Sequence, residues 1–422
     1  MTNKYKTVCM VGLGYIGLPT AAMFASRKVK VIGLDINQHA VDTINKGKIH
    51  IVEPDLDMIV SAAVSQGYLR ATTKPEPADA FLIAVPTPFK GDHMPDISYV
   101  EAAVRSIAPK LQKGNLVILE STSPVGTTEK MAEWLSQSRP DLSFPQQNGE
   151  EADVNIAYCP ERVLPGKVVT ELVNNDRVIG GMTSKCSRAA ASLYKTFVQG
   201  ECVITTARTA EMCKLTENSF RDVNIAFANE LSTICDKLGI NVWELIKLAN
   251  RHPRVNILQP GPGVGGHCIA VDPWFIVSAV PEQARLIRTA REVNDSKPHW
   301  VYEKTKLAVA DYLIANPDKS ARDVTVACFG LAFKPDIDDL RESPSLEIAI
   351  SFKNLNVGKI LVVEPHVKAL PDVLDSKYEL VDSAQAKKRA NILIYLVAHK
   401  EFKSELPVSN DVAMLDVCGL LR

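Results

Sequence analysis

The stretch TVCMVGLGYIG, residues 7–17, decides the fold of this chain. Its first five residues are largely apolar, which predicts a buried strand, and three glycines follow at the spacing GxGxxG. The sequence then predicts a helix over residues 18–27 and a second strand over residues 29–34, which Asp35 closes. A strand, a glycine turn, a helix and a strand that ends in an acid are typical of the Rossmann dinucleotide-binding unit.

This unit predicts the cofactor. The pyrophosphate is expected at the start of the helix, because backbone N–H groups and the helix dipole favour anions there. Asp35 is expected to bind ribose hydroxyls, and its carboxylate would repel a 2′-phosphate. Ile36 and Asn37 follow it instead of an arginine, so the predicted cofactor is NAD rather than NADP. The cofactor-binding residues predicted here are Gly12, Gly14, Tyr15, Ile16, Gly17 and Asp35.

Two further buried strands are expected over residues 80–85 and 116–120, and hydroxyl-rich loops follow both. Ligands of parallel sheets lie across the carboxyl ends of the strands. We therefore expect Thr87, Thr122 and Thr128 to offer hydroxyls to the cofactor or the substrate. A loop hydroxyl can equally cap a helix, and for Thr128 that alternative stays open.

Composition places the chain among ordinary globular proteins. Its 422 residues suffice for two or three domains, the net charge is −1, and 46% of the residues are hydrophobic. The sequence contains no basic patch that would indicate nucleic-acid binding. Neither a signal peptide nor a membrane-spanning apolar run is expected. The nine cysteines are scattered and never in Cys-x-x-Cys spacing, which favours a reducing cytoplasm and predicts no metal site.

A long helical pattern runs over residues 209–238. Lys214, Asn218 and Arg221 lie along one face of it, as a catalytic row or as a solvated stripe. The apolar residues Ile225, Ala226, Phe227 and Leu231 are expected to be buried. A helix of this length between two domains predicts a spine and a dimer contact.

The glycine-rich segment GPGVGGHC, residues 261–268, is the second distinctive stretch. Its glycines keep side chains away, so the backbone can approach another group closely. Cys268 and, four residues later, Asp272 follow them, which suits a reactive thiol presented to a ligand. The alternative is a tight loop followed by a buried structural cysteine.

The C-terminal part repeats the strand–helix alternation and predicts a second, smaller Rossmann-like domain. A helix is expected over residues 298–315, with Pro298 in its first turn. The predicted fold is α/β, with two Rossmann-like parallel-sheet domains joined by a long central helix. The expected domains are residues 1–205, 206–318 and 319–422, and strands are expected at 324–329, 360–363, 392–397 and 413–417.

The motifs together resemble the UDP-glucose/GDP-mannose dehydrogenase family over nearly the whole chain. The matching parts are residues 12–17, 121–127 and 214–218, the Gly-Gly-x-Cys loop with Asp272, and a later Phe-Lys…Arg-Glu-Ser run. The resemblance implies oxidation of the C6 alcohol of a UDP-sugar by two NAD⁺ in succession. Cys268 would form a thiohemiacetal and then a thioester.

Other segments resemble the branch of this family that acts on UDP-N-acetyl-D-mannosamine, with UDP-N-acetylglucosamine and UDP-glucose as alternative substrates. They are residues 51–54, 88–92, 250–256 and 268–274. Val271 stands where many UDP-glucose enzymes carry a lysine before the aspartate, so no role of that lysine is transferred.

The resemblance also implies residue roles. The general base could be Lys214, Asp272 or Glu161, and Arg341 could reach the cofactor. A strand expected over residues 153–158 leads to Glu161, whose carboxylate could equally be a surface charge. The implied catalytic residues are Cys268, Lys214, Asn218 and Asp272. The implied substrate-binding residues are Glu161, Arg162, Val163, Lys214, Asn218, Arg221, His252, Arg254, Gly265 and Lys334.

Two other functions remain open at this point. One is a two-electron dehydrogenase in which Cys268 is structural, and the other is an NAD-binding redox regulator without turnover. A homodimer through the central helix is expected in either case.

Overall fold

A computed structural model describes residues 4–51, 53–163, 166–266, 268–403 and 412–420. The chain divides into two compact units, residues 1–217 and 218–422, and the division falls within helix α9 (Ala207–Leu238). Among the described residues, no helix combines the length and the apolar character that crossing a membrane requires.

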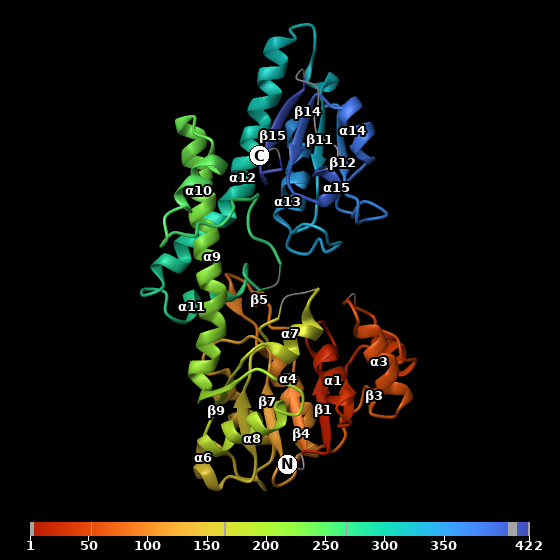
Figure 1. Ribbon diagram of the computed structural model, residues 1–422, viewed down its shortest axis with the longest axis vertical. Coiled ribbons are helices and arrows are strands. Elements are labelled where there is room, and N and C mark those ends of the chain that lie inside the picture. Colours follow the sequence, from red (N-terminus) through yellow and green to blue (C-terminus); the bar gives the residue numbers. More distant parts are fainter. Residues whose placement is uncertain (1–3, 52, 164–165, 267, 404–411, 421–422) are drawn as a thin grey trace. The chain divides into compact units, whose positions relative to one another are not determined.

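The first unit is built on an eight-stranded sheet (Figure 1). Its strand order is β10-β9-β8-β7-β4-β1-β2-β3, and every neighbouring pair is parallel except β8 and β9. The order reverses between β1 and β4, which is where ligands bind in sheets of this kind. The strands are β1 (Thr7–Val11), β2 (Lys30–Leu34), β3 (Leu69–Thr72), β4 (Ala80–Ile83), β7 (Leu116–Leu119), β8 (Asn155–Tyr158), β9 (Arg177–Gly181) and β10 (Cys202–Thr206).

Helices cover both faces of this sheet and bury two apolar cores. One face carries α1 (Gly17–Ser26), α2 (Gln38–Asn45), α3 (Leu56–Ser65), α7 (Val168–Asn174) and α8 (Ser184–Tyr194). The other face carries α4 (Ser98–Ile107) and α5 (Thr127–Ser138). Two further elements are the hairpin of β5 (Phe89–Lys90) with β6 (Met94–Pro95) and the short helix α6 (Pro145–Asn148).

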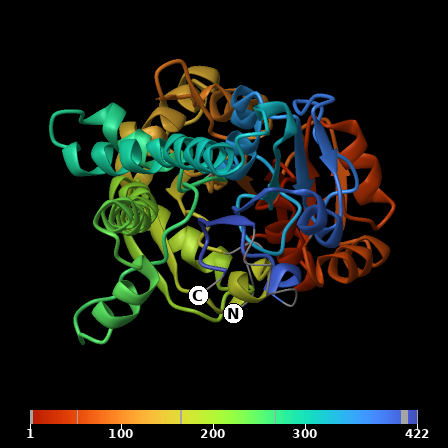
Figure 2. The same cartoon turned by 90° about the horizontal axis from the view of Figure 1, so that it is seen from above.

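The second unit holds a five-stranded parallel sheet in the order β13-β12-β11-β14-β15. Its strands are β11 (Thr325–Phe329), β12 (Lys359–Val363), β13 (Tyr378–Leu380), β14 (Ile392–Tyr395) and β15 (Ala413–Asp416). Helices α12 (Arg285–Ala315) and α13 (Pro344–Ser351) pack on one face, and α14 (Ser383–Arg389) and α15 (Lys400–Lys403) on the other. In Figures 1 and 2, α12 crosses α9 at an angle. Helices α10 (Val242–Ala249) and α11 (Asp272–Ala279) lie between α9 and α12 in the sequence.

The α/β fold with two Rossmann-like parallel sheets and a long helix between them is therefore confirmed. Two local predictions are wrong. Pro298 lies inside α12 rather than in its first turn, because the helix begins 13 residues earlier, at Arg285. Arg291, Asn294 and Lys297 are buried. Their packing stabilises residues 285–297 as part of the helix, although Pro298 lacks the backbone N–H of a helical hydrogen bond. Phe227 is not buried but 51% exposed, and the buried positions near it on α9 include Asp222, Ala226 and Asn229 instead.

In both sheets, the glycine after the first strand forms the same backbone hydrogen bond to the end of the second strand. Gly12 N–H donates to the Leu34 carbonyl at 2.8 Å, and Gly330 N–H donates to the Val363 carbonyl at 2.8 Å. The acid after each second strand, Asp35 or Glu364, then accepts the N–H of the residue that follows the glycine. The second domain thus repeats the local structure of the first without its GxGxxG spacing.

Candidate active site

The three glycines of the first turn have different reasons to be glycine. Gly12 has a φ of +90°, and a Cβ there would lie 2.4 Å from the Ala84 carbonyl oxygen. A Cβ on Gly17 would lie 1.8 Å from the Gly12 oxygen, so this glycine permits close packing of helix and strand. A Cβ on Gly14 would meet no protein atom within 4 Å. Gly14 therefore leaves open space on the side where a pyrophosphate approaches.

The N-terminus of α1 has features that favour the binding of an anion. Its N-cap residue, Ile16, provides no side-chain hydrogen bond, and its first turn contains no acid. The Asp35 carboxylate accepts the N–H of Leu13 at 2.8 Å and that of Asn37 at 2.9 Å. Each carboxylate oxygen can accept a further hydrogen bond, so Asp35 is held at the turn while retaining acceptor capacity for ribose hydroxyls.

The loops after β4 and β7 are tied to each other. The Thr87 hydroxyl donates to the Thr122 carbonyl at 2.5 Å. The Ser121 hydroxyl accepts the Val85 N–H at 2.9 Å and donates to the Val85 carbonyl at 2.7 Å. Thr87 and Thr122 stay partly exposed and lie together at this sheet edge.

Thr128 lies inside the protein instead of at that edge. It is fully buried in the first turn of α5, and its hydroxyl donates to Glu211 on α9 at 2.6 Å. Glu211 also accepts the N–H groups of Gly126 and Thr128, so its carboxylate caps α5, and burial raises its pKa. The hydroxyl that we expected to face a ligand is therefore donated within the protein. Sequence reasoning missed Glu211, whose one signal was its place three residues before Lys214 on the same helix.

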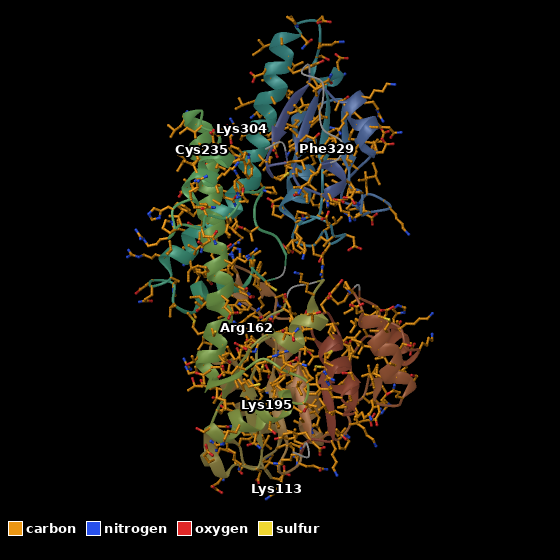
Figure 3. All side chains as sticks on the ribbon, in the orientation of Figure 1. Lys113, Arg162, Lys195, Cys235, Lys304 and Phe329 are labelled. Carbon is orange, nitrogen blue, oxygen red and sulfur yellow. The ribbon has the colours of Figure 1, made fainter. Side chains whose placement is uncertain are left out.

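The loop after β8 brings Glu161 and Arg162 into ion pairs. Glu161 is buried, lies 3.0 Å from the Arg177 guanidinium, and accepts the Arg162 N–H at 2.6 Å. Arg162, labelled in Figure 3, lies 2.8 Å from Glu217 on α9. Val163 packs against the apolar core of this face.

A buried acid lies behind this loop. The Glu120 carboxyl accepts the Tyr194 hydroxyl at 2.5 Å, and the Arg177 guanidinium lies over the Tyr194 ring. Burial raises the pKa of Glu120 to about 7, although the charge of Arg177 and the Tyr194 hydrogen bond oppose that shift. Sequence reasoning missed both residues, because Glu120 directly follows β7 and Arg177 begins β9, and neither belongs to a recognisable motif.

Cys268 differs from every other cysteine of the chain. All nine cysteines lie among the described residues, none of them forms a disulfide there, and Cys268 is the exposed one. Its carbonyl accepts the N–H groups of Val271 and Asp272, so the thiol directly precedes helix α11. The alternative of a buried structural cysteine is therefore wrong as to its burial.

Asn218 and Asp272 are brought together beside this cysteine segment. The Asn218 amide donates to Asp272 Oδ2 at 2.5 Å, and Asp272 is 3% exposed at the start of α11. Lys214 lies one helical turn before Asn218 on α9 and is partly exposed. A carboxylate in the first turn of a helix is favoured by the helix dipole.

The glycines before Cys268 pack against the loop between β11 and α13. A Cβ on Gly265 would lie 2.4 Å from the Glu342 oxygen and 2.9 Å from Phe333 Cβ. A Cβ on Gly266, whose φ is +83°, would lie 3.2 Å from the Phe333 ring. Gly265 was predicted to contact the substrate, but protein atoms fill the space beside its Cα. His267 lies outside the described residues.

The remaining predicted residues lie in the second unit. Lys334 follows Phe333, is partly buried, and has its ammonium 5.9 Å from that ring. Arg341 forms a two-point ion pair with Asp339. Arg221 is exposed on α9, and His252 and Arg254 are exposed after α10, where the Arg254 N–H lies 3.4 Å from His252 Nδ1.

Among the residues that the structure describes, one group could offer ligands to a metal: Asp336, His366, His399 and Glu401. Their candidate ligand atoms lie within 4.8 Å of one another. The buried His399 already uses both ring nitrogens, since Nε2 lies 3.2 Å from Glu364 and Nδ1 accepts the Asp336 N–H at 2.9 Å. Within this group, a hydrogen bond joins Asp336 to His399, and the His366 ring lies 3.6 Å from the Glu401 carboxylate.

Comparison with known proteins covers almost the entire chain. Three descriptions of the UDP-glucose/GDP-mannose dehydrogenase family match in order: the NAD binding domain over residues 6–198, the central domain over 208–296 and the UDP binding domain over 327–421.

Individual relatives agree with these matches. The UDP-N-acetyl-D-mannosamine dehydrogenase of Yersinia pestis is 70% identical over 404 residues, which cover 96% of each chain. The NDP-N-acetyl-D-galactosaminuronic acid dehydrogenase of Ralstonia nicotianae is 66% identical over 94% of this chain and 92% of its own. The solved structure of the UDP-D-ManNAc dehydrogenase from Pyrococcus horikoshii superposes with a TM-score of 0.84 at 38% identity, over 99% of this chain and 96% of its own. The chain belongs to the NAD-dependent UDP-glucose/GDP-mannose dehydrogenase family.

Proposed function

We propose that this enzyme oxidises the C6 alcohol of UDP-N-acetyl-D-mannosamine to the carboxylate. The observation that carries the chemistry is the exposed Cys268, placed four residues before a buried Asp272 that Asn218 holds. The choice of sugar rests on the relatives that are 69–70% identical and carry the name UDP-N-acetyl-D-mannosamine dehydrogenase.

The first domain fits the cofactor. Open space beside Gly14, the uncapped start of α1 and the anchored Asp35 suit the pyrophosphate and the ribose of NAD. NAD⁺, when bound, accepts a hydride in each of the two oxidations that turn an alcohol into an acid. Thr87 and Thr122 extend the same edge of the sheet, and Arg341 is a further candidate for cofactor contact.

Cys268 captures the aldehyde produced by the first oxidation. Its thiolate attacks the aldehyde carbon, and the carbonyl oxygen becomes an oxyanion that is protonated to a thiohemiacetal. The second oxidation removes the hydrogen of that carbon as a hydride, the hydroxyl group gives up its proton, and a thioester remains. Water then attacks the thioester, which releases the carboxylate and returns the Cys268 thiol.

Three side chains support these steps. Asn218 gives one amide N–H to Asp272 and keeps its second N–H for the oxyanion, because a primary amide has two. Lys214, one turn earlier on α9, stabilises the same oxyanion with its positively charged ammonium group. Asp272 orients Asn218 and activates the water that hydrolyses the thioester. Glu161 is less suited as a base, because Arg177 and the Arg162 N–H already engage its carboxylate.

The UDP part of the substrate is assigned to the last domain. Residues 327–421 match the family's UDP binding domain, and Lys334 lies in the loop after β11, where a cation suits a phosphate. The further candidates for contact with the diphosphate, the sugar and its acetamido group are Glu161, Arg162, Val163, Arg221, His252 and Arg254.

A panel of UDP-sugars tests the function. The panel includes N-acetylmannosamine, N-acetylglucosamine, N-acetylgalactosamine and glucose derivatives, and NADH is counted per sugar consumed. Two NADH per sugar, with the manno compound preferred, are expected. One NADH per sugar would indicate a two-electron dehydrogenase, and no NADH with any sugar would indicate a regulator. Preference for the galacto compound would follow the Ralstonia relative instead.

We also propose that the enzyme forms a homodimer through α9. Phe220, Phe227 and Ile234 are spaced by seven residues, so they share one face of the helix, and they are 71%, 51% and 45% exposed. Leu238 adds a further residue that is 66% exposed. An apolar stripe of this kind on a regular helix suits a second copy of the same helix. The nine cysteines form no disulfide in the described part of the chain, which agrees with a reducing cytoplasm.

A further inference from the structure

The contact between α9 and α12 is polar where packed helices are ordinarily apolar. Within the second unit, six polar side chains that are at most 9% exposed line this contact. They recur at intervals of three and seven residues along their helices, so each set lies on one helix face. We call them the polar seam: Asp222, Asn229 and Ser232 on α9, and Arg291, Asn294 and Lys297 on α12.

Four members of the polar seam form one continuous chain of hydrogen bonds. The Arg291 guanidinium donates to Asp222 Oδ1 at 2.6 Å, and the Asn294 amide donates to the same oxygen at 2.8 Å. The Asn229 amide donates to Asn294 Oδ1 at 2.8 Å. Asn229 Oδ1 then accepts the backbone N–H of Gly261 at 2.9 Å.

The donor and acceptor capacity of these groups allows only one orientation for each amide in this series of hydrogen bonds. A carboxylate can only accept hydrogen bonds, so Asp222 requires Asn294 to present its NH₂ group. The oxygen of Asn294 must then face Asn229, which in turn presents its own NH₂ group to Asn294 and its oxygen to Gly261. The carboxylate of Asp222, together with its backbone carbonyl, which accepts the Asn294 amide at 3.1 Å, thus fixes the orientation of two buried amides. Arg291 keeps the acid ionised in a site where burial raises its pKa.

Gly261 is the residue at which the glycine-rich segment begins. Farther along this segment, Gly263 and Gly265 pack against Pro344 and the Glu342 carbonyl, so the segment is held at its beginning and in its middle. Cys268 follows and begins the turn into α11, where Asp272 is bound by Asn218. The position of the thiol therefore depends on where these contacts hold the backbone.

We propose that Asn229, oriented by Asp222 through Asn294, is a positioning residue that sets the place of Cys268 for capture of the aldehyde. This role rests on the proposed function. The first oxidation needs no thiol, whereas aldehyde capture does. Loss of the Asn229 contact should therefore impair capture more than the first oxidation, and aldehyde should escape into solution.

The test compares Asn229→Ser with Asn224→Ser. Asn224 lies on the same helix, and its amide donates to the Phe220 carbonyl one turn earlier, outside the polar seam. Turnover is run with the UDP-sugar in the presence of a hydrazine that traps aldehydes. For Asn229→Ser, the share of sugar trapped should rise by about tenfold, as the loss of a buried hydrogen bond would give. NADH per sugar should fall from two toward one.

Asn224→Ser should trap no more aldehyde than the wild type does. Asp222→Leu, which is close in size, should also raise the share of sugar trapped because it removes the side-chain oxygen that accepts from Arg291 and Asn294. Equal trapping by Asn229→Ser, Asp222→Leu and the wild type would overturn the positioning role.

A second measurement needs no variant. In the wild-type protein, hydrogen exchange should show a strongly protected Gly261 amide, since its acceptor is a fully buried side chain. Exchange at the rate of an unprotected loop amide would also overturn the proposal. Absence of NADH with every UDP-sugar would instead contradict the proposed function and leave the Gly261 measurement interpretable.

Discussion

At the scale of single residues, Cys268 carries the mechanism. Cys268→Ser should fold normally and bind NAD⁺ and UDP, because serine is nearly the same size and the site is exposed. Turnover to the acid should nearly stop, because a serine hydroxyl is far less ionised than a thiol and its ester is a poorer acyl donor to water. The expected record is at most one NADH per sugar in a single turnover, with no thioester adduct by mass spectrometry. Steady-state formation of two NADH per sugar within a few-fold of the wild-type rate would contradict covalent catalysis.

Gly14 and Gly17 should respond in opposite ways to the same substitution. Gly14→Ala adds a methyl group into open space, so unfolding should be unchanged, while NAD⁺ affinity should fall about tenfold, or about 1.4 kcal/mol. Gly17→Ala places a Cβ 1.8 Å from the Gly12 oxygen and should destabilise the fold by about 1–3 kcal/mol. Thermal unfolding and cofactor titration separate the two effects. If Gly14→Ala bound NAD⁺ as the wild type does, no pyrophosphate would approach that glycine.

At the scale of elements, α9 and α12 carry most of what the sequence did not reveal. The first strand, its glycine turn and its acid were predictable, because the pattern lies within 29 consecutive residues, 7–35. The polar seam was not, since 69 residues separate Asp222 from Arg291 and each looks like a surface charge in its own helix. The predicted helix start at Pro298 was wrong for a related reason. The packing that stabilises α12 on both sides of this proline involves α9, which is distant in the sequence.

Lys297 should make stability depend on pH. It is 3% exposed, and burial lowers its pKa to about 7, although its ammonium lies over the Trp300 ring and donates to Ser232. Between pH 7 and the ordinary lysine pKa of about 10.4, the unfolded chain binds the proton and the folded chain does not, so this residue should make stability rise with pH. Lys297→Met should be more stable than the wild type at pH 7 and should lose that rise.

Thermal unfolding of both proteins at several pH values gives the measurement. Lys304→Met serves as the control, since Lys304 joins the same two helices through a partly exposed ion pair with Asp236. If the wild-type and Lys297→Met midpoints ran parallel across this range, Lys297 would titrate as an ordinary lysine.

The exposed stripe on α9 predicts the oligomeric state. Phe227→Arg should convert the dimer to a monomer at micromolar concentration, because a symmetric contact brings the two new charges together. Light scattering after size exclusion measures the mass. Met58→Arg on α3 is the matched control, since Met58 is also exposed, at 64%, but lies in the first unit. A wild-type monomer, or a Phe227→Arg dimer, would remove α9 as the dimer contact.

At the scale of the whole molecule, the two Rossmann-like domains should respond to different ligands. UDP at a hundredfold excess over its Kd should stabilise the protein by about 2.7 kcal/mol, and NADH should stabilise it separately. Lys334→Ala should lose most of the UDP effect and keep the NADH effect. Gly14→Ala should keep the UDP effect and, because its cofactor affinity is about tenfold lower, lose about half of the NADH effect at a hundredfold excess. Calorimetry with each ligand checks this, and loss of both effects in Lys334→Ala would mean that Lys334 maintains the fold.

How far the sequence predicted the molecule differs between these two domains. The first could be predicted in detail, because the spacing of Gly12, Gly14, Gly17 and Asp35 carries its own ligand chemistry. The second has the same strand order and the same anchoring of Glu364 to the glycine turn, yet His399 covers that acid. Since His399 follows a different strand, only the folded structure reveals that the equivalent of Asp35 is engaged there.

The exposure of a single cysteine makes the natural chain a ready-made labelling target. Five thiols are buried, and burial raises the pKa of the partly exposed Cys202, Cys213 and Cys418, which slows their alkylation near neutral pH. A maleimide dye or an affinity tag should therefore attach at Cys268 without removal of the other eight cysteines. The yield of that reaction would count functional sites in a preparation, and a substrate that protects the thiol would be recognised without any coupled assay.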